Sequence, residues 1–230
     1  MRMITDRELR ALDTKNSILL ATGRMLEKYD FKYLTVRNIC EEARAAYGSF
    51  YYHFGSKEEL IHAYCKMKFE QMLQKNPLPD FVDPNDYIMV ILWPMNVYAR
   101  FCEIMGKELI NYLHSICKAD IFYESCFQEC VAAPLQRAAY DGLIKETRDG
   151  QSLLERYNED VSILIWSVIS FWAMVEETRY GGRPHVIVER LVNKLLNSFQ
   201  TEKYAEKVLK GNIDYLLYDD YPGIIDSIVM

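Results

Sequence analysis

The chain has 230 residues, of which 50% are hydrophobic and 26% are charged, so it is neither a disordered nor a fibrous protein. Its formal net charge of -6 excludes a protein that coats nucleic acid through an overall positive charge. Residues 1–60 contain 10 Lys and Arg against 9 Asp and Glu, whereas residues 61–230 contain 17 against 24, so the first part is merely the less acidic one.

The N-terminal part predicts four helices. A first helix is expected from about residue 12 to 29, because apolar residues recur there at spacings of three and four. Thr35 is a suitable N-cap for a short helix over 36–43, and a third helix is expected over 46–53. Ser56 predicts the start of a fourth helix, which continues to about residue 75.

A proline-rich segment, 76–85, predicts a linker. Within it, Asp83 and Pro84 are typical of an N-cap followed by proline at the first helical position, so the next helix is expected to begin there. Pro94 should kink that helix. Further helices are expected over 107–117, 121–145, 152–179 and 185–200. Because no part of the chain alternates like a half-buried strand, the sequence predicts an all-α fold.

Several features predict a cytoplasmic protein. The six cysteines form no Cys-x-x-Cys pair, and the first residues, Met-Arg-Met-Ile-Thr-Asp, lack the apolar stretch of a secretory signal. The uncharged run over 161–175 is shorter than the roughly 17 residues that cross a bilayer as a helix. We therefore expect free thiols, a buried helix at that run and no membrane segment.

The two short helices in the N-terminal part predict a helix-turn-helix, whose second helix can enter the major groove of DNA. Small residues at 45, 46, 48 and 49 would let the backbone approach DNA closely. The segment also carries polar groups suited to phosphate oxygens, at Tyr47, Ser49, Tyr51, Tyr52 and His53. Lys57 adds a cation near the start of the fourth helix. Residue types alone favour an aromatic packing cluster in a small helical domain equally well.

Two blocks in this region are specific: Gly48-Ser49-Phe50-Tyr51-Tyr52-His53-Phe54 and Ser56-Lys57-Glu58-Glu59-Leu60. They follow Ile18-Leu19, Ala21-Thr22, Met25-Leu26, Phe31, Thr35-Val36, Ile39-Cys40 and Ala43. In this order the residues from 18 to 60 resemble the N-terminal signature of the tetracycline-repressor (TetR) family. Tyr-x-His-Phe followed closely by Ser-Lys-Glu is rare outside that family. In the rest of the chain the resemblance is one of architecture only.

The resemblance implies a dimeric transcriptional regulator, in which a small-molecule effector releases a repressor from a palindromic DNA operator. A three-helix helix-turn-helix domain would span 1–57, and a larger helical domain for effector binding and dimerisation would span 58–230. The expected partners are a double-stranded DNA operator, a second copy of the chain in a homodimer, and an unidentified effector. No cofactor, catalytic residue or metal site is expected.

By position, the resemblance also implies individual contacts. Thr35 and Arg37 would contact DNA phosphates from the start of the second helix, and Tyr47 with its neighbours Ala45 and Ala46 would face the bases. The other expected phosphate contacts are Ser49, Tyr51, Tyr52 and Lys57. His53 would either reach a phosphate or pack between the two domains.

The chain departs from the family pattern at the turn between the two short helices. Arg44 stands where the family usually has glycine, and a left-handed backbone there is costly with a side chain. We expect strain or a different turn, and Arg44 is a further candidate for phosphate contact. Ala46 replaces the usual capping serine, so one capping hydrogen bond worth about 1 kcal/mol is missing.

The second domain is expected to hold both the dimer interface and the effector pocket. The helices over 158–180 and 185–200 resemble the family's pairing helices, and a monomeric core is the alternative. Their interface candidates are Val161, Ile165, Val168, Trp172, Val188, Leu191, Leu195 and Phe199. Aromatic and Met side chains suit apolar ligands, which makes pocket candidates of Trp93, Tyr98, Phe101, Met105, Tyr112, Phe122, Tyr123 and Trp166.

Other functions have less support in the residues. His114 with Cys117, and Cys126 with Cys130, are spaced to place two metal ligands on one helix face, but no further ligand stands nearby. An all-helical enzyme would need a cluster of catalytic groups, whereas the four histidines are scattered and no Gly-rich phosphate loop is present. A helical binding module that uses this fold without DNA stays an alternative, because Arg44 is unusual and residues 1–60 are nearly neutral.

Overall fold

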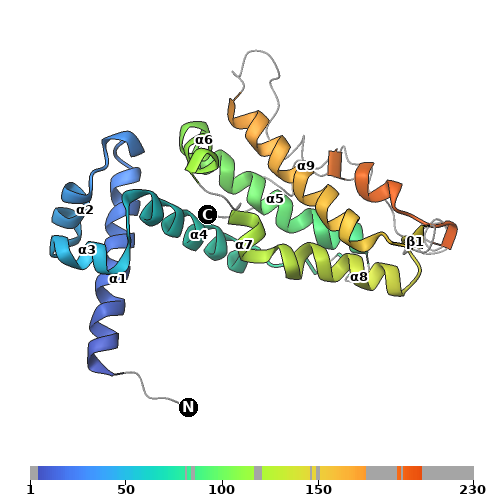
Figure 1. Cartoon of the computed structure of the whole chain (residues 1–230), viewed down its shortest axis with the longest axis horizontal. Helices are drawn as coiled ribbons and strands as arrows, with labels where there is room; N and C mark the ends of the chain where they lie inside the picture. Colours follow the sequence, from blue (N-terminus) through green and yellow to red (C-terminus); the bar gives the residue numbers. More distant parts are fainter. Residues whose placement is uncertain are drawn as a thin grey trace. The chain divides into compact units, whose positions relative to one another are not determined.

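A computed structural model of the chain describes residues 5–80, 82–83, 86–116, 121–145, 147–148, 151–174, 191–192 and 194–203. These residues are predominantly helical, so the prediction of an all-α fold is confirmed. The chain divides into two compact units, Met1–Lys68 (unit 1) and Phe69–Met230 (unit 2), each of which has its own core (Figure 1).

Unit 1 contains α1 (Asp6–Leu26), a 3₁₀ turn η1 (Phe31–Tyr33), α2 (Val36–Ala43), α3 (Tyr47–His53) and the first part of α4 (Lys57–Lys75). Both α2 and α3 pack against α1. The fully buried side chains at their centre are Ile18, Leu34, Ile39, Phe50 and Leu60. The predicted positions of the second, third and fourth helices are confirmed.

The first helix begins six residues before the predicted start, because Thr5 forms a capping box with Glu8. The Thr5 hydroxyl accepts from the backbone N–H of Glu8 at 3.3 Å, and the Glu8 carboxylate accepts from the N–H of Thr5 at 2.8 Å. These hydrogen bonds lower the pKa of Glu8. The helix also ends earlier than predicted, at Leu26, where the N–H of Glu27 donates to Gly23 O.

Gly23 lets α1 approach α4 closely. A Cβ at this position would lie 2.9 Å from two atoms of the Tyr64 phenol, which is too close for any ordinary contact. Tyr64 is buried, and burial raises the pKa of its hydroxyl to about 12. Helix propensity alone counts Gly23 as destabilising, but the packing of α1 against α4 requires a glycine at this position.

Unit 2 contains the end of α4 and the helices α5 (Tyr87–Met105), α6 (Lys107–Ile116), α7 (Ile121–Phe127), α8 (Ala133–Tyr140) and α9 (Leu154–Met174). A π-helical turn, η2 (Gln128–Ala132), joins α7 to α8. The strands β1 (Thr147–Arg148) and β2 (Gln151–Ser152) form a short antiparallel pair. Residues 191–192 and 194–198 are also helical. α5 packs against α6, α8 and α9, which makes it the central helix of this unit.

The N-cap of α5 is Asp86, so the prediction of Asp83 as the cap is wrong. The Asp86 carboxylate accepts from the N–H groups of Ile88 at 3.1 Å and Met89 at 3.3 Å. Pro84, predicted as the first helical residue, lies outside the described residues. By length and composition α5 could cross a membrane, but most of it is buried within unit 2, as in the core helix of a globular domain. The helix continues through Pro94.

The predicted helix over 121–145 is wrong in two places. Its middle contains η2, in which the N–H of Ala133 donates to Gln128 O, five residues back. It ends at Tyr140, because Gly142 adopts a φ of +69° and the N–H of Leu143 donates to Ala138 O at 2.8 Å, a Schellman ending. The chain then forms a bridge between Ile144 and Gln200. Residues 117, 175–179, 185–190 and 193 of the other predicted helices lie outside the described residues.

Candidate nucleic-acid interface

The turn between α2 and α3 keeps the glycine-type conformation although its residue is arginine. Arg44 has φ 53° and ψ 37°, and among the described residues it is the one non-glycine with positive φ. Its N–H donates to Glu41 O at 3.2 Å, and the N–H of Ala45 donates to Cys40 O at 3.0 Å. This is the Schellman ending that usually uses glycine, so the predicted strain is present and the turn is unchanged. The Arg44 side chain is exposed.

The helix α3 buries one aromatic side chain and exposes three. Phe50 is fully buried, whereas Tyr47, Tyr51 and Tyr52 are 55%, 48% and 74% exposed. The N-cap, Ala46, makes no side-chain capping bond, as the sequence predicts. The outer face of α3 therefore presents a row of phenol hydroxyls, while Phe50 fixes the helix on the core of unit 1.

Two of these hydroxyls form a pair. The hydroxyl oxygens of Tyr47 and Tyr51 are 3.2 Å apart and share a hydrogen bond, and their rings meet edge to face at 5.2 Å. The hydrogen bond to Tyr47 raises the pKa of Tyr51, which favours the protonated, donating form of its phenol. This shared bond holds both side chains in one orientation, and the larger exposed fraction of Tyr52 leaves its hydroxyl open to solvent.

Gly48 lies between these tyrosines at the start of α3. A Cβ built there meets no atom within 4 Å, so the fold of the chain does not require a glycine at this position. It differs in this from Gly23. The missing side chain leaves the helix backbone open to an approaching partner.

The start of α2 holds two of the predicted phosphate contacts. Thr35 is the N-cap, its hydroxyl accepts from the N–H of Asn38 at 3.2 Å, and Asn38 Oδ1 accepts from the N–H of Thr35 at 2.7 Å. Arg37 pairs with Glu41 at 3.1 Å, and both side chains are largely exposed. A surface pair of this kind contributes little, about 0.2–1 kcal/mol, so a phosphate could displace Glu41 at small cost.

A further cation, Lys15 of α1, lies close to the end of α3. Its Nζ is 5.9 Å from the centre of the Phe54 ring. Burial, and next the charge of Lys15, lower the pKa of His53, so His53 favours its neutral form. Sequence reasoning missed Lys15, because no local spacing connects it with residues almost forty positions later. Ser49 and Lys57 are half-buried, and Lys57 lies in the first turn of α4, which Ser56 caps by accepting from the N–H of Glu59.

The predicted effector residues lie mainly in a packed core. Tyr98, Phe101 and Phe122 surround Phe69, with ring centres 5.0, 5.5 and 6.1 Å away. Trp93 is buried and its indole N–H donates to Asn76 O at 3.0 Å. The other candidates are more scattered: Met105 and Tyr112 are half-buried, Tyr123 is exposed, and Trp166 stacks on His114 at 4.2 Å.

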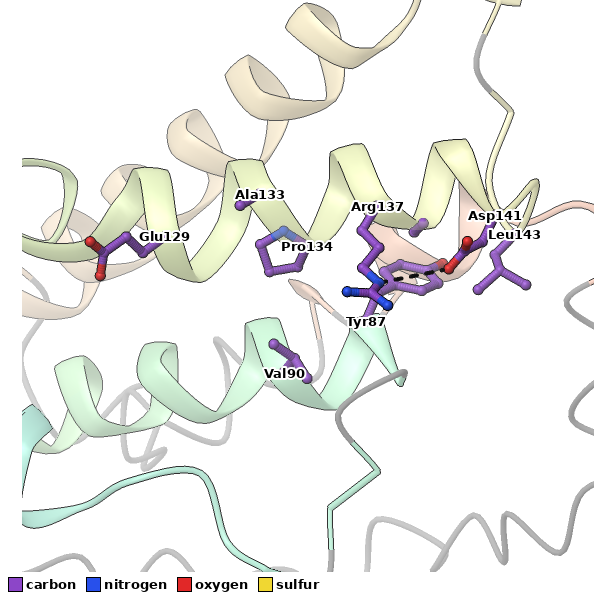
Figure 2. A pocket seen from close by; sticks show the side chains of 9 residues that line it. Tyr87, Val90, Glu129, Ala133, Pro134, Arg137, Asp141 and Leu143 are labelled. Atoms are coloured by element: carbon purple, nitrogen blue, oxygen red, sulfur yellow. Dashed lines mark ion pairs between the residues drawn. The ribbon is translucent and has the colours of Figure 1, made fainter.

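A cavity of about 220 Å³ lies elsewhere in unit 2, between the start of α5 and α8 (Figure 2). None of the eight predicted pocket residues lines it. Its walls come from Tyr87, Val90, Glu129, Pro134, Arg137 and Leu143, together with Ala133, Ala138 and Asp141. Aromatic side chains are not concentrated among these residues, so the sequence pattern that predicts a pocket does not indicate them.

The predicted dimer residues divide between core and surface. Val161, Ile165 and Val168 are buried by the chain itself, and so is Phe199, whose ring stacks on Tyr157 at 3.9 Å. Trp172, Leu191 and Leu195 are half-buried, and Val188 lies outside the described residues. The large apolar side chains that α9 exposes are others, namely Ile163, Phe171 and Met174 at 56%, 47% and 65%.

The short helices α2 and α3, joined by a Schellman turn and packed on α1, define unit 1 as a helix-turn-helix domain, and α3 exposes three phenol groups. Residues 18–64 match the sequence model of the bacterial regulatory proteins of the tetR family, and with this match the predicted family is confirmed. This match lies within unit 1, so the N-terminal part of the chain is similar to these regulatory proteins. A comparison with curated proteins finds no sequence that matches the chain.

Solved structures resemble the chain over both units. Thermus thermophilus FadR, a repressor solved in complex with lauroyl-CoA, covers 81% of this chain and 95% of its own, with a TM-score of 0.56 and 17% identity. RolR in complex with resorcinol covers 86% and 92%, with a TM-score of 0.55 and 15% identity. MexZ of Pseudomonas aeruginosa covers 83% and 96%, with a TM-score of 0.50 and 20% identity. These likenesses show that the fold is shared.

Proposed function

We propose that the chain is a transcriptional repressor that binds a palindromic operator as a cytoplasmic homodimer and releases it when a small-molecule effector binds unit 2. The observation that carries this proposal is the exposed face of α3, on a domain that matches the tetR family. Three exposed tyrosines lower the solubility of a globular protein and do not contribute to its core, so a partner is expected to cover them.

The chemistry of this face suits a DNA backbone. Protonated phenol hydroxyls donate hydrogen bonds to phosphate oxygens, and such contacts set the position of a recognition helix in the major groove. Tyr51 and Tyr52 follow the first turn of α3, whereas Tyr47 and Gly48 begin the helix and are placed to approach base edges. The nearby cations Arg37, Arg44 and Lys57 supply the charge that the acidic chain as a whole lacks.

A homodimer follows from the same requirement. One helix-turn-helix contacts few bases, and a two-fold dimer doubles the contacts by using two half-sites about one helical turn apart. The support within unit 2 is the exposed row on α9: Ile163, Phe171 and Met174 are spaced by eight and three residues, which places them on one helix face. This row, rather than the buried Val161 and Ile165, is the surface that a second copy would cover.

Control by an effector is supported by two of the similar structures. FadR was solved with lauroyl-CoA and RolR with resorcinol, so this fold accommodates small ligands in both proteins. In the chain described here, an effector that binds one dimer conformation more tightly would shift the spacing of the two α3 helices and lower operator affinity.

Fluorescence anisotropy with DNA from the region upstream of the coding sequence tests the proposal. Binding should weaken steeply as salt rises, because phosphate contacts release counterions. Tyr52→Ala should weaken binding to all bound sequences alike, about tenfold, since it removes a hydrogen bond to a charged group. Tyr140→Ala is the matched control, because Tyr140 is 90% exposed and lies in unit 2. Salt-independent binding, or none over a genomic fragment library, would contradict the proposal.

A further inference from the structure

The cavity between α5 and α8 has an apolar floor and a charged rim. Tyr87, Ala138 and Leu143 are buried at its floor, and the Tyr87 hydroxyl donates to Leu196 O at 3.0 Å. The charged lining residues are Glu129, Arg137 and Asp141. Figure 2 shows Glu129 at one end of the cavity and the Arg137–Asp141 pair at the other, with Val90 and Pro134 between them on opposite helices.

A π-helical turn and a proline lie beside the open space. Pro134 lines the cavity and follows η2, and Pro94 stands one turn beyond Val90 in α5. Proline has no N–H, so the carbonyls of Cys130 and Val90, four residues earlier, lack the donor that an α-helix supplies. A π-helical turn such as η2 is rare and concentrates at functional sites, because it widens a helix locally. The segment that joins α7 to α8 is therefore irregular where it faces the cavity.

The charges at the rim do not balance. Arg137 Nε is 4.0 Å from Asp141 Oδ2, so these two side chains pair at one end. Glu129 is exposed and makes no ion pair within the residues that the structure describes. The rim thus carries two carboxylates and one guanidinium. Glu129 is the carboxylate without an ion pair among the described residues, and it lies at one end of the apolar part of the cavity, the slot between Val90 and Pro134.

We propose that this cavity binds a small organic cation, with an ammonium group at Glu129 and an alkyl or aryl body against Val90, Pro134 and Tyr87. An ammonium ion offers three donors, which matches a site that is rich in acceptors. An anionic ligand is disfavoured, because the guanidinium at the site is Arg137 and it already faces Asp141. The proposal concerns binding to unit 2 and does not depend on DNA binding by unit 1.

Isothermal titration of the full chain with 2-phenylethylamine tests this site, and 3-phenylpropionate provides the matched anion with a similar ring and chain. The amine should bind with a dissociation constant of about 1 mM or tighter, and the carboxylate should bind at least about tenfold more weakly. Equal or tighter binding of the carboxylate would overturn the proposal. So would the absence of amine binding up to about 10 mM.

Two variants locate the ligand. Glu129→Gln keeps the size of the side chain, removes its charge and should weaken amine binding about tenfold. Glu155→Gln, at an exposed position of α9 outside the cavity, should leave it unchanged. Val90→Phe should fill the slot and abolish binding, and its folding can be checked by circular dichroism. Amine binding that survives both Glu129→Gln and Val90→Phe would contradict the assignment.

Discussion

The aromatic residues of α3 in unit 1 and those around Phe69 in unit 2 differ in burial. On α3, Tyr47, Tyr51 and Tyr52 stay in solvent and only Phe50 enters the core. In unit 2, Tyr98, Phe101 and Phe122 pack around Phe69 and leave no surface for a partner. Aromatic content alone therefore does not identify a binding site, because the same residue types form an exposed face on α3 and a buried core in unit 2.

The largest expected effect comes from the aromatic core of unit 2. Phe101→Ala removes a fully buried ring and should lower the free energy of unfolding by about 3–5 kcal/mol. Tyr123→Ala, at an exposed position that the sequence grouped with Phe101, should change it by less than about 1 kcal/mol. Denaturation followed by tryptophan fluorescence is suited to this measurement, since all three tryptophans lie in unit 2. Equal losses would contradict the assignment of Phe101 to the core.

The glycine of α1 gives the next largest effect. Gly23→Ala should destabilise unit 1 by about 1–3 kcal/mol, because the new methyl group would overlap the Tyr64 phenol. Helix propensity alone predicts a gain of about 0.5–1 kcal/mol, so the sign decides between packing and propensity. Thermal unfolding followed by circular dichroism measures it, and a stabilised variant would show that Tyr64 moves away freely.

Arg44 has a strained backbone and lies on the surface that we propose to contact DNA. Arg44→Gly should raise the stability of unit 1 by about 1 kcal/mol, since glycine adopts a φ of 53° without strain. The same change should weaken operator binding and reduce the salt dependence by about one phosphate contact. Arg44→Lys, which keeps both the charge and the strain, is the control. Unchanged operator affinity in Arg44→Gly would remove Arg44 from the interface.

The smallest effect concerns His53. Burial lowers the pKa of His53 in the folded chain, so its contribution to stability is present above the unfolded pKa of about 6.5 and is lost as pH falls. Unfolding midpoints of the native chain should therefore decline more steeply between pH 7 and pH 5 than those of His53→Gln. Parallel pH profiles would show that His53 titrates alike in both states.

The sequence predicted unit 1 better than unit 2 because its signals there are local. Thr35 caps α2 through Asn38, three residues away, and Ser56 caps α4 in the same way. Apolar periodicity does not predict the early start of α1. The spacing of Thr5 and Glu8, which is that of a capping box, would have indicated it.

In unit 2 the decisive contacts join distant parts of the chain. The cavity brings Tyr87 and Leu143 together across more than fifty residues, and no spacing rule connects them. The burial of Val161 and Ile165 likewise depends on which neighbouring helices cover α9, and the apolar pattern of that helix is the same for a core and for a dimer interface. Asp86 caps α5 instead of Asp83, because the local sequence offers two carboxylates three residues apart and does not decide between them.

Gly48 offers the most direct test of the central claim that the outer face of α3 contacts DNA. Within the chain its missing side chain leaves open space, so Gly48→Ala should leave unit 1 as stable as before or about 0.5 kcal/mol more stable. If the backbone of α3 lies against DNA, the same methyl group should weaken operator binding about tenfold or more, measured by anisotropy on the folded variant. A variant that is stable and binds the operator as tightly as the native chain would contradict the account.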